Sequence, residues 1–284
     1  MSIICRKRMI EYYRSNDSIK HVKLYNYAIE LKHKILKSSD KFLLGIVDHP
    51  FKSKDISVKN YKNFLNHKNC MGVFSEDWLG DPHPKLTIMP IGFESNAIKS
   101  GKEKYLIEMS KTMKNVEDKP LRVLSNATLA TYPIPKSKYR DDRQNLLDNC
   151  SDNPLIDFWK EKRSYQETFK IHNDYAFECC PEGNGIDTHR FYEAILLNTI
   201  PIVRRNPLTP MYEKHFPCLI VNEWSDINEE LLKESLEENK DKFKDKSYCY
   251  MDYWKEYIEN KIETMHLYRG YKEYRSRPII ELIE

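Results

Sequence analysis

Long apolar runs, glycine and an excess of charge of one sign are all scarce in this chain of 284 residues. No apolar run approaches the roughly 18–20 residues that a membrane-spanning helix needs, and the mean hydropathy is −0.71. The 46 Lys and Arg residues nearly balance the 43 Asp and Glu residues, so no general basic field attracts nucleic acid. A hydrophobic share of 40% with 12% aromatic residues excludes a disordered chain. We therefore expect a globular protein without a membrane span or a nucleic-acid partner.

Cysteine spacings typical of disulfide frameworks or metal sites are also lacking. The seven cysteines are scattered, no CxxC pattern occurs, and Cys179 and Cys180 form the only close pair. An odd number of scattered cysteines in a chain of this length indicates free thiols in a reducing compartment. Charged residues from Arg6 onward also interrupt the apolar core that a secretory signal needs. We therefore expect a cytoplasmic protein.

Short apolar runs alternate with helical patterns along the chain, which is typical of α/β proteins with parallel sheets. The runs that predict strands are 42–47, 71–74, 86–91, 121–124, 175–179, 199–203 and 218–221. The patterns that predict helices are 18–38, 101–118, 140–149, 165–172, 188–197, 227–238 and 248–265. Pro120 separates two such series, so we expect two Rossmann-like domains, residues 1–118 and 119–247. Residues 248–284 are then expected to return to the first domain as a helix.

Glycine is concentrated after one predicted strand. The chain has only eight glycines, and two of them, Gly183 and Gly185, follow the strand 175–179 within the sequence PEGNG. Glycine lets the backbone approach a ligand closely, and Asp187 or Thr188 is a suitable N-cap for the helix that follows. Free N–H groups and the positive end of the helix dipole converge at such a turn, so the pattern predicts a phosphate site.

The first turns of this predicted helix carry an arginine and a glutamate with helical spacing. Arg190 and Glu193 are i, i+3 neighbours, so both side chains can project into one cleft. A cation in the first turn opposes the helix dipole unless an anion is present. We interpret Arg190 as a clamp for phosphate and Glu193 as an acceptor for ribose hydroxyls. The alternative is a solvated Arg–Glu pair, which contributes only about a few tenths of a kcal/mol.

A longer stretch around this helix resembles a known family. The segment FECCPEGNGIDTHRFYEAILLNTIPIV, residues 177–203, resembles the nucleotide-sugar signature of exostosin-like glycosyltransferases, family 47. In that signature a strand leads to Pro-x-Gly, then Asp, Arg, an acidic residue and a returning strand with Ile-Pro-Val. The segment HPKLTIMPIGFES, residues 83–95, resembles the acceptor-side strand and turn of the same group. Asn198 and Thr199 stand where the family often has Gly-Cys.

The resemblance implies a GT-B architecture, in which two Rossmann-like domains face a cleft, and sugar transfer with inversion at the anomeric carbon. The co-substrate would be a UDP-sugar, first of all UDP-xylose, while galactose, arabinose, glucuronic acid and N-acetylglucosamine stay open. The chain is similar to compact chlorovirus-type members, from large DNA viruses of algae, that build capsid glycans, which implies action in the host cytoplasm. Carried onto this sequence, the donor-binding residues are Asn126, Arg140, Arg143, Pro181, Gly183, Asn184, Gly185, Asp187, Thr188, Arg190 and Glu193.

No obligatory metal or other cofactor is expected. Arg190, a second basic group and helix N–H groups would stabilise the diphosphate leaving group, and Arg140 and Arg143 are the candidates for the second group. The adjacent Asp141 and Asp142 lie in a charged helical pattern. A metal site needs convergent ligands, so we interpret these carboxylates as solvated.

An inverting transfer also needs a general base that deprotonates the acceptor hydroxyl. Asp48 and His49 directly follow one predicted strand, and Asp77 follows the next. Trp78, beside Asp77, can stack on a sugar of the acceptor, and Glu94 is a further acceptor-side candidate. We place the base first at Asp48, with Asp77, His49 and Glu94 as alternatives.

Two other functions remain open for the same fold. One is a catalytically inactive scaffold that binds a glycan or a nucleotide, and the other is a nucleotide-binding regulatory protein. The complete set of Asp187, Arg190 and Glu193 favours the enzyme. Hydrolysis of the donor would separate the enzyme from the scaffold, and a regulatory protein would bind nucleotide without binding glycan.

Overall fold

The protein is described by a computed structural model. It describes residues 2–16, 20–23, 41–47, 65–76, 82–95, 101–127, 138–159, 161, 163–183 and 185–267. The chain divides into two compact units. Unit 1 comprises Met1–Ile91 and Tyr250–Glu284, and unit 2 comprises Gly92–Cys249. Both units are α/β with parallel sheets, as the alternation of apolar runs and helical patterns predicts.

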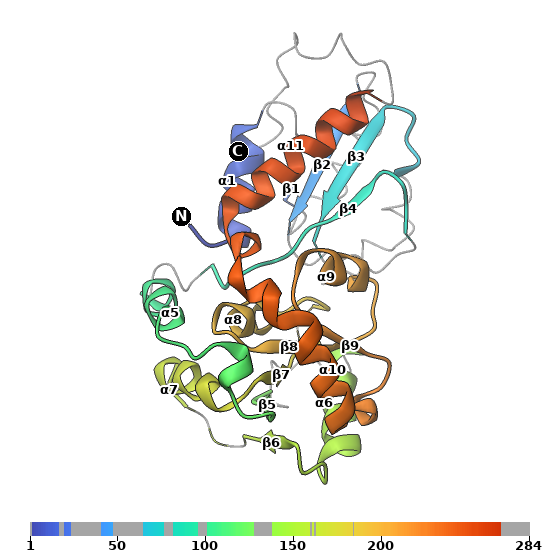
Figure 1. Ribbon diagram of the computed structural model, residues 1–284. Coiled ribbons are helices and arrows are strands. Elements are labelled where there is room, and N and C mark those ends of the chain that lie inside the picture. Colours follow the sequence, from blue (N-terminus) through green and yellow to red (C-terminus); the bar gives the residue numbers. More distant parts are fainter. Residues whose placement is uncertain are drawn as a thin grey trace. The chain divides into compact units, whose positions relative to one another are not determined.

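The described strands of unit 1 form a parallel sheet in the order β1-β2-β3-β4. They are β1 (Lys20–Lys23), β2 (Phe42–Val47), β3 (Cys70–Ser75) and β4 (Leu86–Ile88). Helix α1 (Arg6–Ser15) and the long helix α11 (Met251–Leu267) belong to the same unit, and Figure 1 shows both beside the sheet. The return to unit 1 at Tyr250 lies close to the predicted return at residue 248.

Two glycines let α1 and α11 approach this sheet closely. A Cβ on Gly45 would lie 2.7 Å from the ring of Tyr13 in α1, and a Cβ on Gly72 would lie 2.6 Å from the sulfur of Met265 in α11. Gly72 pairs with Leu43, two residues before Gly45, so both glycines face the same side of the sheet. The two helices therefore cover one face, and a larger side chain at either glycine would displace a helix side chain.

The described strands of unit 2 form a second parallel sheet in the order β6-β5-β7-β8-β9. They are β5 (Val123–Ser125), β6 (Ile156–Phe158), β7 (Phe177–Cys179), β8 (Ile200–Arg204) and β9 (Leu219–Val221). Strand β5 pairs with β6 on one side and with β7 on the other. This is the doubly wound order in which the chain builds outward from β5 in both directions.

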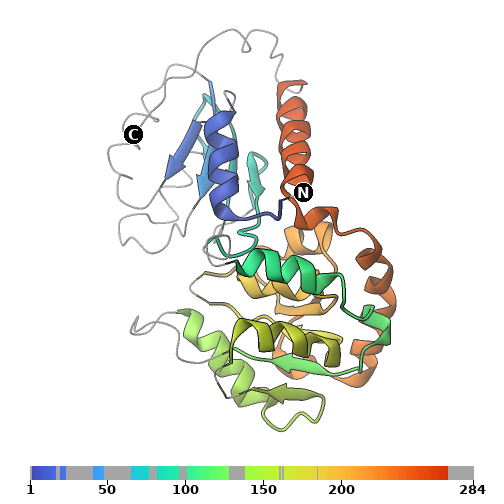
Figure 2. The ribbon, with the colours of Figure 1, turned by 90° about the vertical axis from the view of Figure 1, so that its left-hand side faces the viewer.

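Helices cover both faces of this second sheet. Figure 1 shows α6 and α10 on one side and α5, α7 and α8 on the other, and Figure 2 looks onto the latter side. The α-helices are α5 (Lys102–Ser110), α6 (Lys138–Cys150), α7 (Tyr165–Lys170), α8 (His189–Leu196), α9 (Thr209–His215) and α10 (Glu229–Asn239). The 3₁₀ turns are η1 (Val116–Asp118), η2 (Ile171–Asp174), η3 (Trp224–Asp226), η4 (Lys240–Lys244) and η5 (Ser247–Cys249).

The core under α6 and α10 is assembled from apolar side chains of all the described strands of unit 2. It contains Val123, Ile156, Phe177, Ile200, Ile202, Leu219 and Val221 from the strands, together with Leu146, Cys150, Trp224 and Leu232 from the covering elements. Each of these side chains is buried, so the sheet and this helical layer form one apolar interior. This interior holds strands β5 and β7 in place, and the loops of the candidate site follow the carboxyl ends of these two strands.

Three features differ from the sequence-based expectations. Residues 20–23, expected within a helix, form β1 because they pair with β2, and pairing outweighs local propensity. Strand β6 was not expected at all. The unit boundary lies after Ile91 instead of residue 118, because α5 packs with unit 2, where Tyr105 stacks on Phe169 with ring centroids 6.3 Å apart. Within the described residues no helix is both long and apolar enough to cross a membrane.

Candidate functional site

The order of the strands in unit 2 points to one edge of its sheet. The connection after β5 leads to β6 on one side, whereas the connection after β7 leads to β8 on the other side. In such sheets ligands bind outside the carboxyl ends of the two strands where the direction reverses. Asn126 follows β5 at this edge, and the turn formed by residues 181–185 follows β7.

The start of α6 holds the glycine turn in place. The backbone N–H of Glu182 donates to Asp142 Oδ2 over 2.9 Å, and Arg143 Nε donates to the carbonyl of Glu182 over 2.9 Å. Within the turn, the N–H of Gly183 donates to the carbonyl of Gly185 over 2.9 Å. A Cβ on Gly183 would lie 3.0 Å from Nη2 of Arg143, so glycine here lets the guanidinium lie against the turn. Asp142, expected to be solvated, is 6% exposed and serves this structural role.

Arg143 lies against this turn, and Arg190 is close enough to influence its charge. Burial, followed by the positive charge of the nearby Arg190, lowers the pKa of the Arg143 guanidinium to about 10. Both guanidiniums nevertheless remain charged at neutral pH. Arg190 lies in the first turn of α8, where the helix dipole disfavours a cation. Two like charges held at the positive end of a helix are therefore a site that an anion would stabilise.

The partner of Arg190 is a carboxylate inside the sheet. Glu178, in the middle of β7, is 1% exposed, and its Oε1 lies 3.5 Å from Arg190 Nε. Its other oxygen, Oε2, lies 2.9 Å from Nε2 of His172. The Nδ1 of His172 lies 2.8 Å from the carbonyl of Thr168, and because a carbonyl can only accept, Nδ1 is the donor. The 3.5 Å ion pair between Arg190 and Glu178 is longer than an ordinary hydrogen bond.

A third arginine at the same edge is already neutralised. Arg204, at the end of β8, lies 3.4 Å from Asp142 and 3.4 Å from Glu223. Two carboxylates balance its charge, whereas Arg190 has one carboxylate partner among the described residues. Among the described residues, Arg190 is therefore less fully neutralised than Arg204.

Asn126 carries an unsatisfied amide at this edge. Its Oδ1 is buried and has no hydrogen-bond partner in the described part of the chain. A buried acceptor without a donor costs free energy, and a ligand hydroxyl or N–H would remove that cost. The donor-binding role of Asn126 stays a prediction.

Asp187 and Thr188 do not have the capping role that the sequence suggests. Asp187 is 2% exposed and accepts hydrogen bonds from the hydroxyls of Tyr192 and Tyr212, at 2.5 and 2.9 Å, and from the backbone N–H of Thr188 at 2.9 Å. Thr188 stands at the N-cap position, but its side chain does not cap the helix. The carboxylate of Asp187 therefore holds α8 and α9 together, and its donor-binding role stays a prediction.

Glu193 and Glu94 share one lysine. Lys102 Nζ, at the start of α5, lies 2.8 Å from Glu193 and 3.4 Å from Glu94. Burial alone lowers the pKa of Lys102, but the two carboxylates outweigh burial and raise it. Arg190 and Glu193 therefore have different partners, although both belong to the first turns of α8. The sequence places Glu94 on the acceptor side, whereas the structure places it in unit 2.

The remaining predicted site residues fall outside what the structure describes. They are Asp48, His49, Asp77, Trp78 and Asn184, together with the side chain of Arg140. Pro181 is buried directly after β7 and Cys180. Burial raises the pKa of both the Cys179 and the Cys180 thiol well above the ordinary value, so neither forms the thiolate that a nucleophile needs.

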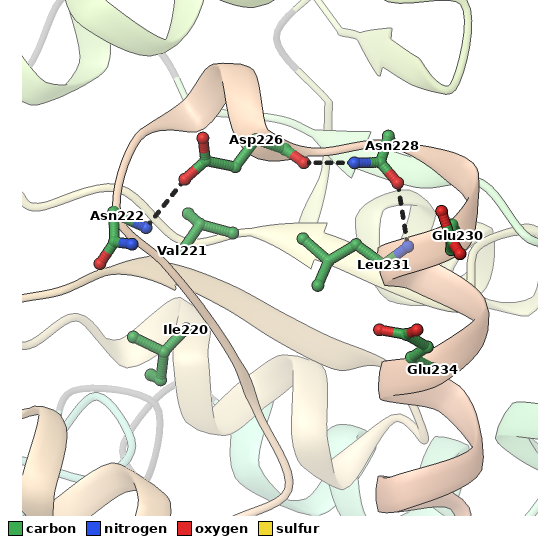
Figure 3. A pocket seen from close by; sticks show the side chains of 8 residues that line it. All are labelled: Ile220, Val221, Asn222, Asp226, Asn228, Glu230, Leu231 and Glu234. Atoms are coloured by element: carbon green, nitrogen blue, oxygen red, sulfur yellow. Dashed lines mark hydrogen bonds between the residues drawn. The ribbon is translucent and has the colours of Figure 1, made fainter.

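A separate cavity of about 540 Å³ lies at the end of β9 (Figure 3). Its ionisable lining side chains are the carboxylates of Asp226, Glu230 and Glu234, and no cationic side chain is among its described lining residues. Asp226 already accepts the backbone N–H of Asn222. A negative lining repels a diphosphate, so the cavity does not compete with the glycine turn as its site.

Comparison of the chain with protein-family models and with curated proteins gives no match. The geometry therefore carries the functional argument. Sequence reasoning found Arg143, Arg190 and the glycine turn but missed Glu178 and Lys102. A signal for Glu178 was present, because it is a charged residue within the apolar strand 175–179.

Proposed function

We propose that this protein is a nucleotide-sugar-dependent glycosyltransferase of the GT-B type that inverts the configuration of the transferred sugar. The observation that carries the proposal is the position of Arg143 against the Gly183 turn, at the carboxyl end of β7, with Arg190 near enough to lower the pKa of Arg143. A nucleotide diphosphate is the ligand whose charge fits two guanidiniums and a helix N-terminus. The sequence resemblance of residues 177–203 to family 47 supplies the reaction class.

In this proposal the arginines act on the leaving group. As the bond between the sugar and the diphosphate breaks, negative charge grows on the diphosphate, and preorganised cations stabilise that charge most in the transition state. Arg190 is the principal group and Arg143 the second. Asn126 would accept a hydrogen bond from a hydroxyl or N–H of the donor, because its own Oδ1 lacks a donor among the described residues. No metal is required for this arrangement.

The acceptor would be a hydroxyl of a glycan, and UDP-xylose is our first choice of donor. A general base must take the proton of that hydroxyl as its oxygen attacks the anomeric carbon. The two domains of a GT-B enzyme divide this work, with the donor on the second domain and the base on the first. We keep Asp48 as the base, with Asp77 and His49 as alternatives on the first domain. Glu94 is a further alternative, although it lies in unit 2.

Thermal-shift and calorimetric titrations with UDP and a panel of UDP-sugars test the donor site, because a ligand at 100 times its Kd stabilises a protein by about 2.7 kcal/mol. We expect UDP and one UDP-sugar to bind, and that UDP-sugar to be slowly hydrolysed without an acceptor. Binding without hydrolysis or transfer would indicate the inactive scaffold instead. Absence of binding by UDP and by every UDP-sugar would contradict the proposal.

The position of the base is tested by substitution. Asp48→Asn should abolish transfer to the glycan, because no group then accepts the hydroxyl proton, while the Kd of UDP stays within about twofold since the donor site lies on other residues. Steady-state transfer assays and UDP calorimetry measure the two quantities. If Asp48→Asn keeps the wild-type kcat and Asp77→Asn loses it, the base is Asp77.

A further inference from the structure

The two oxygens of the Glu178 carboxylate are held very differently. Oε2 lies 2.9 Å from His172 Nε2, and that histidine is itself fixed by its 2.8 Å contact with the Thr168 carbonyl. Oε1 is buried and has no hydrogen-bond partner among the described residues. Its nearest charged neighbour is Arg190 Nε at 3.5 Å. One side of the carboxylate is therefore anchored, and the other faces Arg190 across a loose contact.

Glu178 is an unusual residue for its position. It lies in the strand β7, between Phe177 and Cys179, both of which are fully buried. A buried carboxylate carries a desolvation penalty that close, hydrogen-bonded partners must offset. His172 Nε2 at 2.9 Å is such a partner for Oε2, whereas Arg190 Nε at 3.5 Å is not one for Oε1. An apolar residue at this position would avoid that cost. The carboxylate thus has a role that packing does not supply.

We propose that Glu178 is an internal competitor of the diphosphate for Arg190. Before the donor binds, Glu178 supplies the counter-charge that lets Arg190 lie beside Arg143. When the donor binds, the phosphate oxygens take the guanidinium fork of Arg190, and Glu178 keeps its anchored contact with His172. This inference rests on the proposed function, since it assigns the diphosphate to the same arginines.

The competition acts mainly on product release. A transferase that leaves UDP behind must let go of that product after each turnover, and strong cation–diphosphate contacts slow its departure. A carboxylate that is fixed next to Arg190 attracts the guanidinium back and weakens the hold on UDP. Removing its charge while keeping its shape should therefore tighten diphosphate binding, whereas a purely structural residue would weaken binding when changed.

Glu178→Gln is the variant that separates these cases. Calorimetric titration with UDP and with inorganic pyrophosphate should give Kd values about tenfold lower than in the wild type, which corresponds to about 1.4 kcal/mol. The ligand-free variant should melt at a lower temperature, because Arg190 then loses the carboxylate with which it forms an ion pair. Its melting temperature should consequently rise more on addition of UDP than that of the wild type.

A double-mutant cycle with Arg190→Ala shows whether the effect passes through that arginine. In the Arg190→Ala background, Glu178→Gln should leave the Kd of UDP unchanged. Ile202→Val, a mild change in the core on the neighbouring strand β8, controls for loss of stability alone and should leave the Kd of UDP as in the wild type.

The outcomes distinguish this inference from the function on which it rests. If Arg190→Ala weakens UDP binding and Glu178→Gln leaves it equal or weaker, the donor site stands and the competitor role of Glu178 is wrong. A tenfold gain that persists without Arg190 would also overturn it. If UDP and pyrophosphate bind to neither the wild type nor Glu178→Gln, the proposed function and this inference both fail.

Discussion

Basic side chains lie at both ends of helix α8, and they make different contacts at the two ends. At its C-terminal end, Lys246 Nζ donates to the carbonyl of Leu196 over 2.8 Å, and Lys119 Nζ donates to the carbonyl of Leu197 over 2.7 Å. At its N-terminal end, Arg190 makes one ion pair at 3.5 Å. The lysines thus satisfy carbonyls that the helix leaves without partners, whereas the arginine has no hydrogen bond to a backbone group in the part of the chain that the structure describes.

The charges at the two ends differ as well. Burial, followed by the neighbouring Lys246 and Lys114, lowers the pKa of Lys119 to about 6, and burial lowers the pKa of Lys246 to about 8. Lys119 is therefore largely neutral at pH 7 and still donates its hydrogen bonds. Arg190 and Arg143 stay charged, and they do so where the helix dipole opposes them. Lys246, with a pKa of about 8, also keeps most of its charge at pH 7, but at the helix end where the dipole favours a cation. Arg190 lies at the end where the dipole disfavours one.

The largest effect is expected at the N-terminal end. Arg190→Ala should reduce kcat by about 10²–10³-fold, the range for loss of a preorganised group that stabilises transition-state charge. Steady-state kinetics with the UDP-sugar measure this effect. Arg190→Lys keeps the charge but loses the planar fork, so it should fall between the wild type and Arg190→Ala. An unchanged kcat in Arg190→Ala would make the glycine turn a structural feature only.

Substitution of Lys119, at the C-terminal end of α8, should change the stability of the protein and not its activity. The pKa of Lys119 is about 6 in the folded protein and about 10.4 in an unfolded chain. Between these values the unfolded chain binds one more proton, so stability rises with pH by up to about 1.4 kcal/mol per pH unit from this group. Below pH 6 both states are protonated and the contribution to the slope vanishes.

Lys119→Met should therefore reduce the increase in stability between pH 6.5 and pH 9. Urea denaturation at several pH values measures the slope in the wild type and in the variant. Lys233, paired with Glu229 on the surface of α10 and 62% exposed, provides the control Lys233→Met, which should leave the slope unchanged. Parallel curves for the wild type and Lys119→Met would show that Lys119 is charged in the folded protein.

A smaller effect is expected at Glu193. Its contacts with ribose hydroxyls would be the same in the ground state and in the transition state, so Glu193→Gln should raise KM about fivefold with little change in kcat. The Kd of UDP should rise by the same factor, which corresponds to a loss of about 1 kcal/mol of binding free energy. Glu94→Gln changes the other carboxylate beside Lys102 and should leave the Kd of UDP unchanged. If Glu193→Gln lowers kcat without changing KM, Glu193 contacts the reacting bond and not the ribose.

Chelation should have the smallest effect of all. If Arg143 and Arg190 hold the diphosphate, EDTA should leave the rate of sugar transfer within about twofold, because no bound ion takes part in the chemical step. Transfer assays with and without EDTA, and then with Mn²⁺ added back, measure this. Complete loss of activity that Mn²⁺ restores would contradict the assignment of the diphosphate to the arginines.

Much of the sheet could be predicted from the sequence because its strands are apolar runs that end at turn residues. Strand β2 has the predicted bounds, and α8 lies within the predicted helix 188–197. Strand β6 could not be found this way, since it has three residues and carries Asp157 in its middle. Residues 156–158 form a strand because they pair with β5. Asn198 has a left-handed backbone, with φ 56°, which is a conformation that glycine and asparagine adopt most readily.

Only part of the candidate site could be predicted from the sequence. Scarce glycines and a cation at a helix N-terminus were visible as a local pattern, so Gly183 and Arg190 could be singled out. Arg143 was named only through the resemblance to family 47. Lys102 could not be found, because it comes from α5 and only the fold brings it to Glu193 of α8. The contact of Asp187 with Tyr212 of α9 was out of reach for the same reason, since Tyr212 comes from a distant part of the chain.

Calorimetric titration of UDP into three proteins at pH 7 tests the difference between the two ends of α8 most directly. The proteins are the wild type, Arg190→Ala and Lys119→Met, each checked to be folded at the temperature used. We predict that Lys119→Met binds UDP as the wild type does, and that Arg190→Ala binds it at least about tenfold more weakly. Equal affinity of the wild type and Arg190→Ala, or a loss confined to Lys119→Met, would contradict the account.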